Sequence, residues 1–243
     1  MHLNFAVVTP MANEGVDFDP FIRALSSVFD SLGSGTCYLV IDKVSKDNTL
    51  ELCQNLSNRD KRFVTLWAPE NRNVVQAYMV GYRAAVANNH EFIIEMDAGL
   101  SHDPKAIPLF LKALADGNEC AYGSRFMKGG SISDSSSKRS LLSKSGTLLS
   151  RVLLGLKLHD ATSGFQGFHR SIVEKFLNYQ LLSEAHFCHP EMRYLLRKKR
   201  YIEIPIHYRA PSPRVSSKVV SNSLEILFHY FLLRLKGKAP EID

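Results

Sequence analysis

The sequence predicts an α/β protein whose doubly wound, mostly parallel sheet is flanked by helices. Short apolar runs alternate along the chain with longer amphipathic stretches, which is the pattern of strands separated by helices. Continuous apolar runs of this length are typical of strands buried on both faces of a parallel sheet. The 243 residues are 45% hydrophobic and 22% charged, enough apolar material for one sizeable core.

The first half of the chain supplies most of this alternation. Strands are predicted at residues 5–8, 37–41, 63–67, 92–96 and 119–123. Helices are predicted at residues 19–32, 48–57, 73–88 and 104–115, with Asp19 and Asp103 as caps before Pro20 and Pro104. Such sheets bind ligands outside the carboxyl ends of their strands.

The second half of the chain has a different character. Residues 127–140 are rich in Gly and Ser, which indicates a mobile loop over a site or a plain linker. A Leu-rich helix is expected at 140–156 and a strand at 201–208. Residues 221–238 form an amphipathic helix with a basic end, either an interfacial segment or a core or dimer helix. We therefore expect a main domain at 1–218 and a helical tail at 219–243.

The charge balance indicates an anionic partner. The formal net charge is +6 and the pI is about 9.1, which suits a nucleotide, a phospholipid headgroup or a nucleic acid. The four cysteines lie far apart without a CxxC pair, so no disulfide framework is expected. No signal peptide or membrane-spanning run is recognisable, so the expected location is the cytoplasm.

Polar residues follow three of the predicted strands. Pro10 to Glu14 follow the first strand, Asp42 and Asp47 the second, and Asp97 the fourth. In a parallel sheet these strand ends meet at one edge. A single acid would more often be a turn or cap residue, but three acids at one edge favour a ligand site.

Seven segments in order resemble inverting family 2 glycosyltransferases of GT-A fold, and among them the dolichol- and polyprenol-phosphate mannosyltransferases. The resemblance runs from about residue 5 to residue 218. Its segments are VVTPMANE, VIDKVSKDNT, ENRNVVQAYMVGYRAA, EMDAGLSHDP, YGSRFMKGG with KRSLLSKSGTLLSRVLL, DATSGFQGFHR and EIPIHYRAPSPRVSSK.

The resemblance implies roles for individual residues. The base and ribose of a nucleotide sugar, linked to GDP or UDP, would be held by Pro10, Ala12, Glu14 and Asp42. Asp97, with Ala98 beside it, would face the ribose or a Mg²⁺ or Mn²⁺ ion on the pyrophosphate. Basic side chains would meet the pyrophosphate and the acceptor phosphate; these are Arg125, Arg139, Arg214 and Lys218.

The chain departs from the family pattern at three places. The family's DXD segment reads Asp97-Ala98-Gly99, so the second acid is missing. Three outcomes follow: weakened metal use, neutralisation by Arg and Lys, or loss of sugar transfer. Ser212 stands where the family has an Arg, for which Arg214 would substitute. Lys43 stands where relatives often have a second Asp, so the nucleotide base of the donor could be guanine or uracil.

The segment HFCHPEMRYL at 186–195 has two interpretations. His186, Cys188, His189 and Glu191 suggest a metal site, although their spacing matches no standard zinc pattern. The resemblance instead places Glu191 on the acceptor side, where it would be a general base for a hydroxyl acceptor. The segment DATSGFQG would shape the acceptor pocket or be purely structural.

The resemblance implies a glycosyltransferase that moves a hexose, mannose or similar, from a nucleoside diphosphate sugar to an acceptor, polyprenyl phosphate being the one expected, with inversion; the residues themselves predict an anion-binding crevice. Peripheral membrane contact is expected and a nucleic-acid partner is not. The alternatives are a non-catalytic nucleotide-sugar-binding relative, and a transferase to a sugar or protein hydroxyl with Glu191 as base.

Overall fold

The computed structural model describes residues 3–133, 137–209 and 217–242. Its strands are β1 (Phe5–Met11), β2 (Thr36–Ile41), β3 (Phe63–Trp67), β4 (Phe92–Glu95), β5 (Cys120–Ser124), β6 (Ser131–Ser133), β7 (Gln166–His169), β8 (Tyr201–Pro205) and β9 (His207–Arg209). Its helices are α1 (Phe18–Leu32), α2 (Thr49–Arg59), α3 (Val74–Ala87), α4 (Ile107–Ala115), α5 (Ser137–Leu149), α6 (Arg170–Phe176), α7 (Cys188–Leu195) and α8 (Ser217–Leu235), with short turns η1 (Pro104–Ala106) and η2 (Ser150–Leu154).

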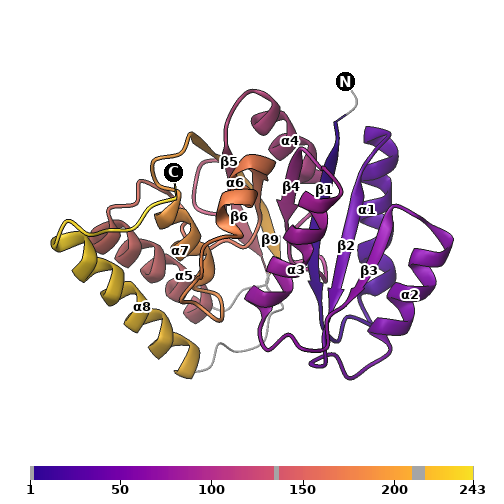
Figure 1. The fold of residues 1–243 in the computed structure, drawn as a ribbon, viewed down its shortest axis with the longest axis horizontal. Coiled ribbons are helices and arrows are strands. Elements are labelled where there is room, and N and C mark those ends of the chain that lie inside the picture. The colour runs from indigo at the N-terminus through magenta and orange to yellow at the C-terminus, as the bar shows by residue number, and fades with distance from the viewer. Residues whose placement is uncertain (1–2, 134–136, 210–216, 243) are drawn as a thin grey trace.

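Seven strands form the central sheet in the order β3-β2-β1-β4-β7-β5-β8 (Figure 1). All neighbouring pairs are parallel except those of β7, which runs antiparallel to both β4 and β5. The predicted doubly wound, mostly parallel sheet is thus confirmed. The five predicted strands of the first half correspond to β1–β5, while β7 falls in a segment for which only a pocket-shaping or structural role was predicted.

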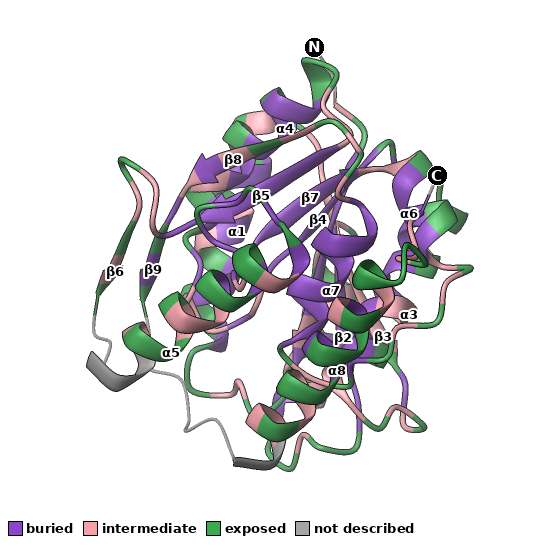
Figure 2. Cartoon of the chain, turned by 90° about the vertical axis from the view of Figure 1, so that its left-hand side faces the viewer, coloured by how far each residue is buried: buried purple, intermediate pink, exposed green. Residues whose placement is uncertain are grey.

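The strand alternation divides the core into two layers. Phe5 and Val7 point to one face, which α1, α2 and α4 cover, and Ala6 and Val8 point to the other. The second face is covered by α3, α6, α7 and α8. Figure 2 shows the buried sheet behind the partly exposed helices α5 and α8. Because both faces are covered, the apolar strands lose their contact with water.

Close packing of α3 on the sheet depends on Gly81. A Cβ atom at this position would collide with the side chain of Val8 on β1. The absence of a side chain therefore lets α3 approach β1, and this approach brings the amino-terminal half of α3 to the edge where β1 and β4 end.

Several local predictions need correction. Helix α1 begins at Phe18, so Asp19 lies in its first turn and is not its cap. The predicted mobile loop at 127–140 contains β6, which pairs with β9, and the start of α5. Residues 134–136 within it lie outside the described residues. The predicted strand at 201–208 is divided into β8 and β9, which belong to different sheets.

Other local predictions are confirmed. Asp103 caps η1, accepting a hydrogen bond from the backbone N–H of Lys105 at 3.0 Å. The four cysteines are free and buried. Within the described ranges, no helix has the length and apolarity needed to cross a bilayer.

Candidate active site

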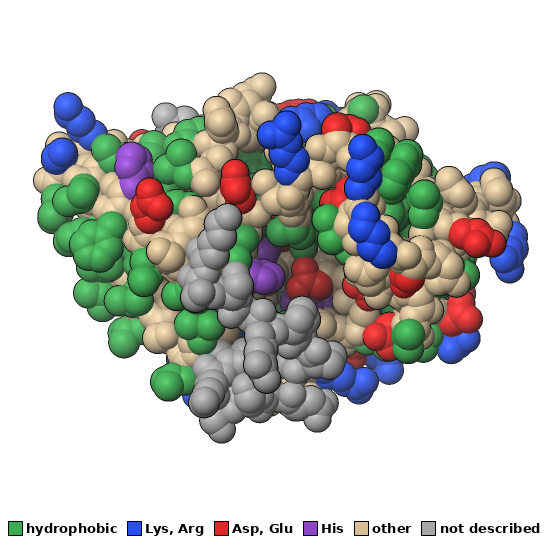
Figure 3. All heavy atoms as spheres, turned by 90° about the horizontal axis from the view of Figure 1, so that it is seen from below, with side chains coloured by type: hydrophobic (Ala, Val, Ile, Leu, Met, Phe, Trp, Pro, Cys, Tyr) green, Lys and Arg blue, Asp and Glu red, His purple; other side chains and the backbone are tan. Residues whose placement is uncertain are grey.

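The site lies where β1, β2 and β4 end. β1 stands between the other two and is parallel to both, so the segments after all three strands leave the sheet at the same edge. Figure 3 views this edge and shows acidic and histidine side chains in a hollow of the surface. The predicted common edge for Glu14, Asp42 and Asp97 is therefore present, as expected for an open α/β sheet.

Hydrogen bonds tie the loop after β1 to the loop after β2. The backbone N–H groups of Asn13, Glu14 and Gly15 donate to Ser45 Oγ, Thr49 Oγ1 and Asp47 Oδ2 respectively, at 3.1, 2.8 and 2.9 Å. These bonds hold the two loops together before any ligand arrives. Asp47, which the sequence placed after the second strand, thus accepts hydrogen bonds that fix the two loops.

The remaining residues predicted to bind the nucleotide take different positions. Pro10 is the penultimate residue of β1 and Ala12 follows that strand, exposed. Asp42 follows β2, and its Oδ1 accepts the backbone N–H of Val44 at 2.8 Å. Ala98 lies in the hydrophobic core, so its side chain is turned away from a ligand at the surface. Only its backbone is available for the predicted contact.

Asp97 is held in place by two residues. The hydroxyl of Tyr78, on α3, donates to Asp97 Oδ1 at 2.7 Å. The Asp97 backbone N–H donates to His102 Nδ1 at 3.2 Å. Burial opposes ionisation of Asp97, but the charge that His102 and the other nearby histidines carry at the acidic pH where Asp97 titrates, together with the bond from Tyr78, brings the pKa of Asp97 below the ordinary value. Its side chain is still 45% exposed, so a fixed carboxylate faces the hollow.

His102 is a neutral acceptor. Its Nδ1 receives the Asp97 N–H, so the ring proton resides on Nε2. Burial lowers the pKa of His102 to about 4. The 3.8 Å approach of Nδ1 to Asp97 Oδ2 is consequently no ion pair near neutral pH. Neither His102 nor Tyr78 was assigned to the site from sequence. Tyr78 was counted among the residues on the apolar face of a predicted helix.

A buried ion pair lies behind Asp97. His189 Nε2 is 2.7 Å from Glu95 Oε1 and His189 Nδ1 is 3.3 Å from the backbone oxygen of His186. Both partners are acceptors, so both ring nitrogens donate. Burial opposes this charge, but the neighbouring anion raises the pKa of His189 well above its ordinary value. Tyr82 and Gln166 complete the shell around Glu95 Oε2.

The ends of β1 and β4 place Glu14 near enough to Asp97 for the charge of Asp97 to act on it. A Cβ atom built on Gly99 would lie 2.9 Å from Glu14 Oε2. Burial and the nearby carboxylates of Asp17, Asp97 and Asp47 raise the pKa of Glu14 to about 7. The Glu14 carboxylate therefore lies next to the space that a side chain at position 99 would fill.

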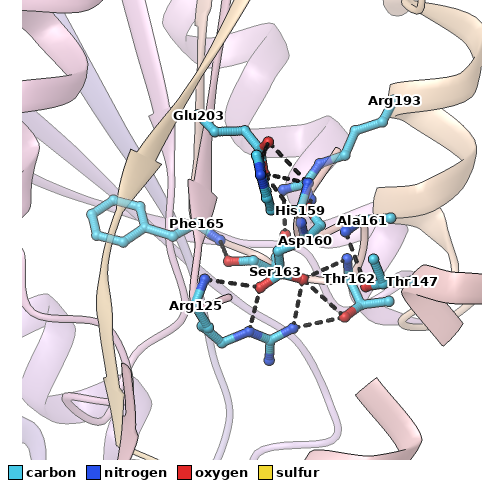
Figure 4. A network of polar contacts seen from close by, with 10 residues as sticks. All are labelled: Arg125, Thr147, His159, Asp160, Ala161, Thr162, Ser163, Phe165, Arg193 and Glu203. Atoms are coloured by element: carbon cyan, nitrogen blue, oxygen red, sulfur yellow. Dashed lines mark hydrogen bonds and ion pairs between the residues drawn. The ribbon is translucent and has the colours of Figure 1, made fainter. Parts of the chain in front are cut away.

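Arg125 faces a carboxylate of the chain itself. Figure 4 shows its guanidinium beside Asp160, with Nε 2.6 Å from Oδ2 and Nη2 2.9 Å from Oδ1. Nη2 also donates to Thr162 Oγ1 at 2.6 Å. Nη1 makes no hydrogen bond to any described residue and points away from this network. Only this nitrogen remains for the predicted contact with a phosphate.

The segment from Asp160 to Phe165 is held from several sides. Because β7 is antiparallel, its amino-terminal end lies where β4 and β5 end, and this brings the segment to the site. Arg193 on α7 donates to the backbone oxygens of Asp160 and Ser163 at 2.5 and 2.7 Å. Glu203 accepts the backbone N–H groups of His159 and Asp160. The segment is therefore rigidly placed, which its sequence alone did not decide.

Glu191 does not reach the hollow. It is fully buried, and its carboxylate accepts the backbone N–H groups of Leu182 and Ser183 and the hydroxyl of Tyr230 on α8, at 2.8, 2.9 and 2.6 Å. The prediction of an acceptor-side base at this position conflicts with this geometry. Glu191 instead anchors α8 to the core.

The side chains of three predicted basic residues are not among those that the structure describes. Arg214 falls outside the described residues, and so do the side chains of Arg139 and Lys218, although their backbones belong to α5 and α8. Their predicted contacts with phosphate stay predictions.

The available ligands suit a metal ion that is completed by substrate. In the part of the chain that the structure describes, no group of three or more His, Cys, Asp or Glu side chains is arranged to hold a metal. The zinc interpretation of residues 186–191 is therefore not supported. Mg²⁺ takes one or two protein carboxylates together with phosphate oxygens and water, which fits the carboxylate pair beside Gly99.

Comparison with known proteins assigns the chain. A sequence model of glycosyl transferase family 2 matches residues 6–177. That match covers most of the chain, which therefore belongs to glycosyltransferase family 2. The protein is accordingly a glycosyltransferase, as the resemblance of its motifs predicted.

Individual relatives agree with this assignment. Polyprenol monophosphomannose synthase of Mycolicibacterium smegmatis is 28% identical over 82% of this chain and 77% of its own length. Dolichol-phosphate mannosyltransferase of Pyrococcus furiosus is 26% identical over 99% of this chain and 66% of its own length.

A solved structure confirms the GT-A fold. Glucosyl-3-phosphoglycerate synthase from Mycobacterium tuberculosis, in complex with Mn²⁺, UDP-glucose and phosphoglyceric acid, superposes with a TM-score of 0.68. The match covers 97% of this chain and 80% of that one at 16% identity.

Proposed function

We propose that the protein transfers a hexose, mannose or similar, from a nucleoside diphosphate sugar to polyprenyl phosphate with inversion at the anomeric carbon. The observation that carries this proposal is the placement of Glu14 and Asp97 at the neighbouring ends of β1 and β4, close enough for the charge of Asp97 to act on Glu14. Gly164 of the segment 160–165 lies beside Asp97. The relatives named as polyprenol- and dolichol-phosphate mannosyltransferases support the acceptor class.

The chemistry requires little proton transfer. A phosphate oxygen of the lipid is already anionic, and it attacks the anomeric carbon from the face opposite the leaving group. The new C–O bond forms as the bond to the diphosphate breaks, and the nucleoside diphosphate leaves with the electron pair. A bound Mg²⁺ or Mn²⁺ ion would supply positive charge to that leaving group. Asp97 would hold the ion, and the buried position of Glu191 is then no obstacle.

An apolar surface supports contact with a membrane. Helix α8 is anchored by Ile226, Leu227 and Tyr230 and turns a second stripe outward. The exposed apolar residues of this α5–α8 surface are Leu141, Leu142, Leu148, Leu149, Val152, Leu224, Phe228, Leu232 and Leu235. Both helices lie side by side in Figures 1 and 2, and hydrophobic side chains gather on this side in Figure 3.

Basic residues border the α5–α8 surface. They are Arg151, Lys157, Arg234, Lys236 and Lys238, all exposed. An apolar face with a basic rim is suited to a bilayer with anionic headgroups. Such contact would bring the lipid-linked phosphate to the site without a membrane-spanning helix.

The test is transfer of radiolabelled sugar into lipid by the purified chain. GDP-mannose and UDP-glucose are offered in turn, with polyprenyl phosphate in vesicles, and the label is counted after organic extraction. The expected result is label in the lipid with one donor and none with polyprenol that lacks the phosphate. Donor binding without label in any extract would favour the non-catalytic alternative that Gly99 suggests.

A further inference from the structure

We propose that Glu14 replaces the acid missing at position 99, so that Glu14 and Asp97 together hold the divalent cation of the site. This inference rests on the proposed function, because the cation would be the one bound with the donor diphosphate. It assigns Glu14 to the metal, whereas the resemblance to the family places that residue at the base and ribose.

The first support is the position of the Glu14 carboxylate. Oε2 lies 2.9 Å from the point where a Cβ of residue 99 would stand. An acidic side chain growing from position 99 would begin in contact with this oxygen. Glu14 on the β1 loop thus brings a carboxylate to the place that a DXD segment fills from the β4 loop.

The second support is that Glu14 has a fixed backbone and an unpartnered carboxylate. Its N–H donates to Thr49 Oγ1 at 2.8 Å, and its backbone oxygen accepts the N–H of Asp17 at 3.1 Å. Thr49 Oγ1 is itself bound to Asp47 Oδ1 at 2.6 Å. No described residue makes a hydrogen bond or ion pair with the Glu14 side chain. A half-buried carboxylate in this state is costly unless a proton or a cation neutralises it.

The third support is the sign of the surrounding charge. The charged groups that act on Glu14 are the carboxylates of Asp17, Asp47 and Asp97. A nucleoside diphosphate is itself anionic, so this side of the hollow repels it unless a cation lies between them. Carboxylate and phosphate oxygens are hard donors, which favours Mg²⁺ or Mn²⁺ over softer metals.

The geometry at Gly99 does not allow an acid at position 99 while the Glu14 carboxylate keeps its present position. Gly99 has φ +71°, a conformation that L side chains rarely adopt, and an added Cβ would meet Glu14. Asp is among the residues best tolerated at positive φ. An acidic side chain at position 99 therefore requires the Glu14 side chain to move or to be removed. Moving the acid from position 14 to position 99 should keep the number of carboxylates that bind the cation unchanged.

The experiment measures Mn²⁺ binding by the loss of the free-ion EPR signal, alone and with GDP or UDP. We expect nucleotide-dependent binding by the wild-type chain, weakened at least about tenfold in Glu14→Gln, since even residues that only orient metal ligands change affinity by 10–100-fold. Gly99→Asp added to Glu14→Ala, which also clears the atoms that a Cβ at 99 would meet, should recover most of the binding that Glu14→Ala alone loses. Asp17→Asn removes a neighbouring charge without removing a ligand and should leave binding near the wild-type level.

Three results would overturn the inference: wild-type affinity in Glu14→Gln, no recovery in the double variant, or no Mn²⁺ binding by the wild-type chain with either nucleotide. Thermal unfolding of each variant shows whether the fold is intact, and Glu14→Asp, which keeps the carboxylate, should bind more tightly than Glu14→Gln. The proposed function fails separately, if Mn²⁺ binding depends on Glu14 but no sugar enters the lipid.

Discussion

Arg125 and Asp160 form a buried two-point ion pair, with Nε to Oδ2 at 2.6 Å and Nη2 to Oδ1 at 2.9 Å. The Asp160 side chain is fully buried and that of Arg125 is 6% exposed. Arg125 directly follows β5, and Asp160 begins the segment that leads to β7. The pair therefore joins two parts of the site that lie 35 positions apart in the chain.

Asp160→Ala should therefore destabilise the protein severely. Removing one partner leaves the Arg125 charge buried without compensation, and we expect unfolding to become easier by roughly 3–5 kcal/mol. Urea denaturation measures this change. Asp116→Ala is the matched control, because Asp116 pairs only with the exposed Lys112 among the described residues and its loss should cost at most about 1 kcal/mol. Equal losses in both variants would contradict our assignment.

The same pair predicts a dependence of stability on pH. Burial opposes ionisation of Asp160, but the bonds from Arg125 lower its pKa below the ordinary value in the folded state. The stabilisation is thus complete above about pH 4 and is lost as the pH falls further, because the unfolded chain takes up the proton first. Denaturation at several acidic pH values should show a shallower decline for Asp160→Ala. Parallel curves would rule out a lowered pKa.

Tyr78→Phe tests the hydroxyl that fixes Asp97. The variant keeps the ring but removes the donor to Asp97 Oδ1. If Asp97 holds the donor complex, we expect sugar transfer, measured at a temperature where the variant is folded, to fall about tenfold, on the scale of a lost bond to a charged group. Tyr38→Phe is the control, since the Tyr38 hydroxyl contacts His90 instead. An unchanged rate in Tyr78→Phe would exclude this positioning role.

Glu191→Gln separates a structural acid from a general base. Gln offers one oxygen to three donors and turns its NH₂ group toward one of them, so we expect a loss of about 1–3 kcal/mol in stability. Transfer at a temperature where the variant is folded should stay close to the wild-type rate. A fall of two orders of magnitude or more in the folded variant would restore the predicted base role, for which that is the usual scale.

Phe228→Ser with Leu232→Ser tests the α5–α8 surface. Both residues are exposed on the outward stripe of α8, so their loss should spare the fold. Co-sedimentation with anionic vesicles should weaken at least about tenfold, because each large apolar side chain contributes roughly 1.5–3 kcal/mol when fully buried. Leu109→Ser, at a 50% exposed position on α4, is the control. Wild-type sedimentation of the double variant would exclude this face.

The strand ends could be predicted from sequence because the signals are local. Continuous apolar runs predicted β1–β5. The acids that follow three of these strands were expected at one edge of the sheet, because parallel strands end together. The missing acid at Gly99 was also visible. These features depend on near neighbours in the chain, so the alternation of strand and helix determined both the fold class and the edge that carries Asp97.

Tertiary structure alone decided the partners of these residues. Tyr78 approaches Asp97 because Gly81 lets α3 pack on β1, and Arg125 meets Asp160 because β7 enters the sheet between β4 and β5 in reverse. Glu191 is buried because α8 returns to cover it, which no spacing of residues 186–195 could indicate. The sequence by itself determined which groups come to the edge of the sheet. Which of them stay free to bind a ligand depended on contacts between distant segments, since a buried polar group is paired with whatever the packing brings beside it.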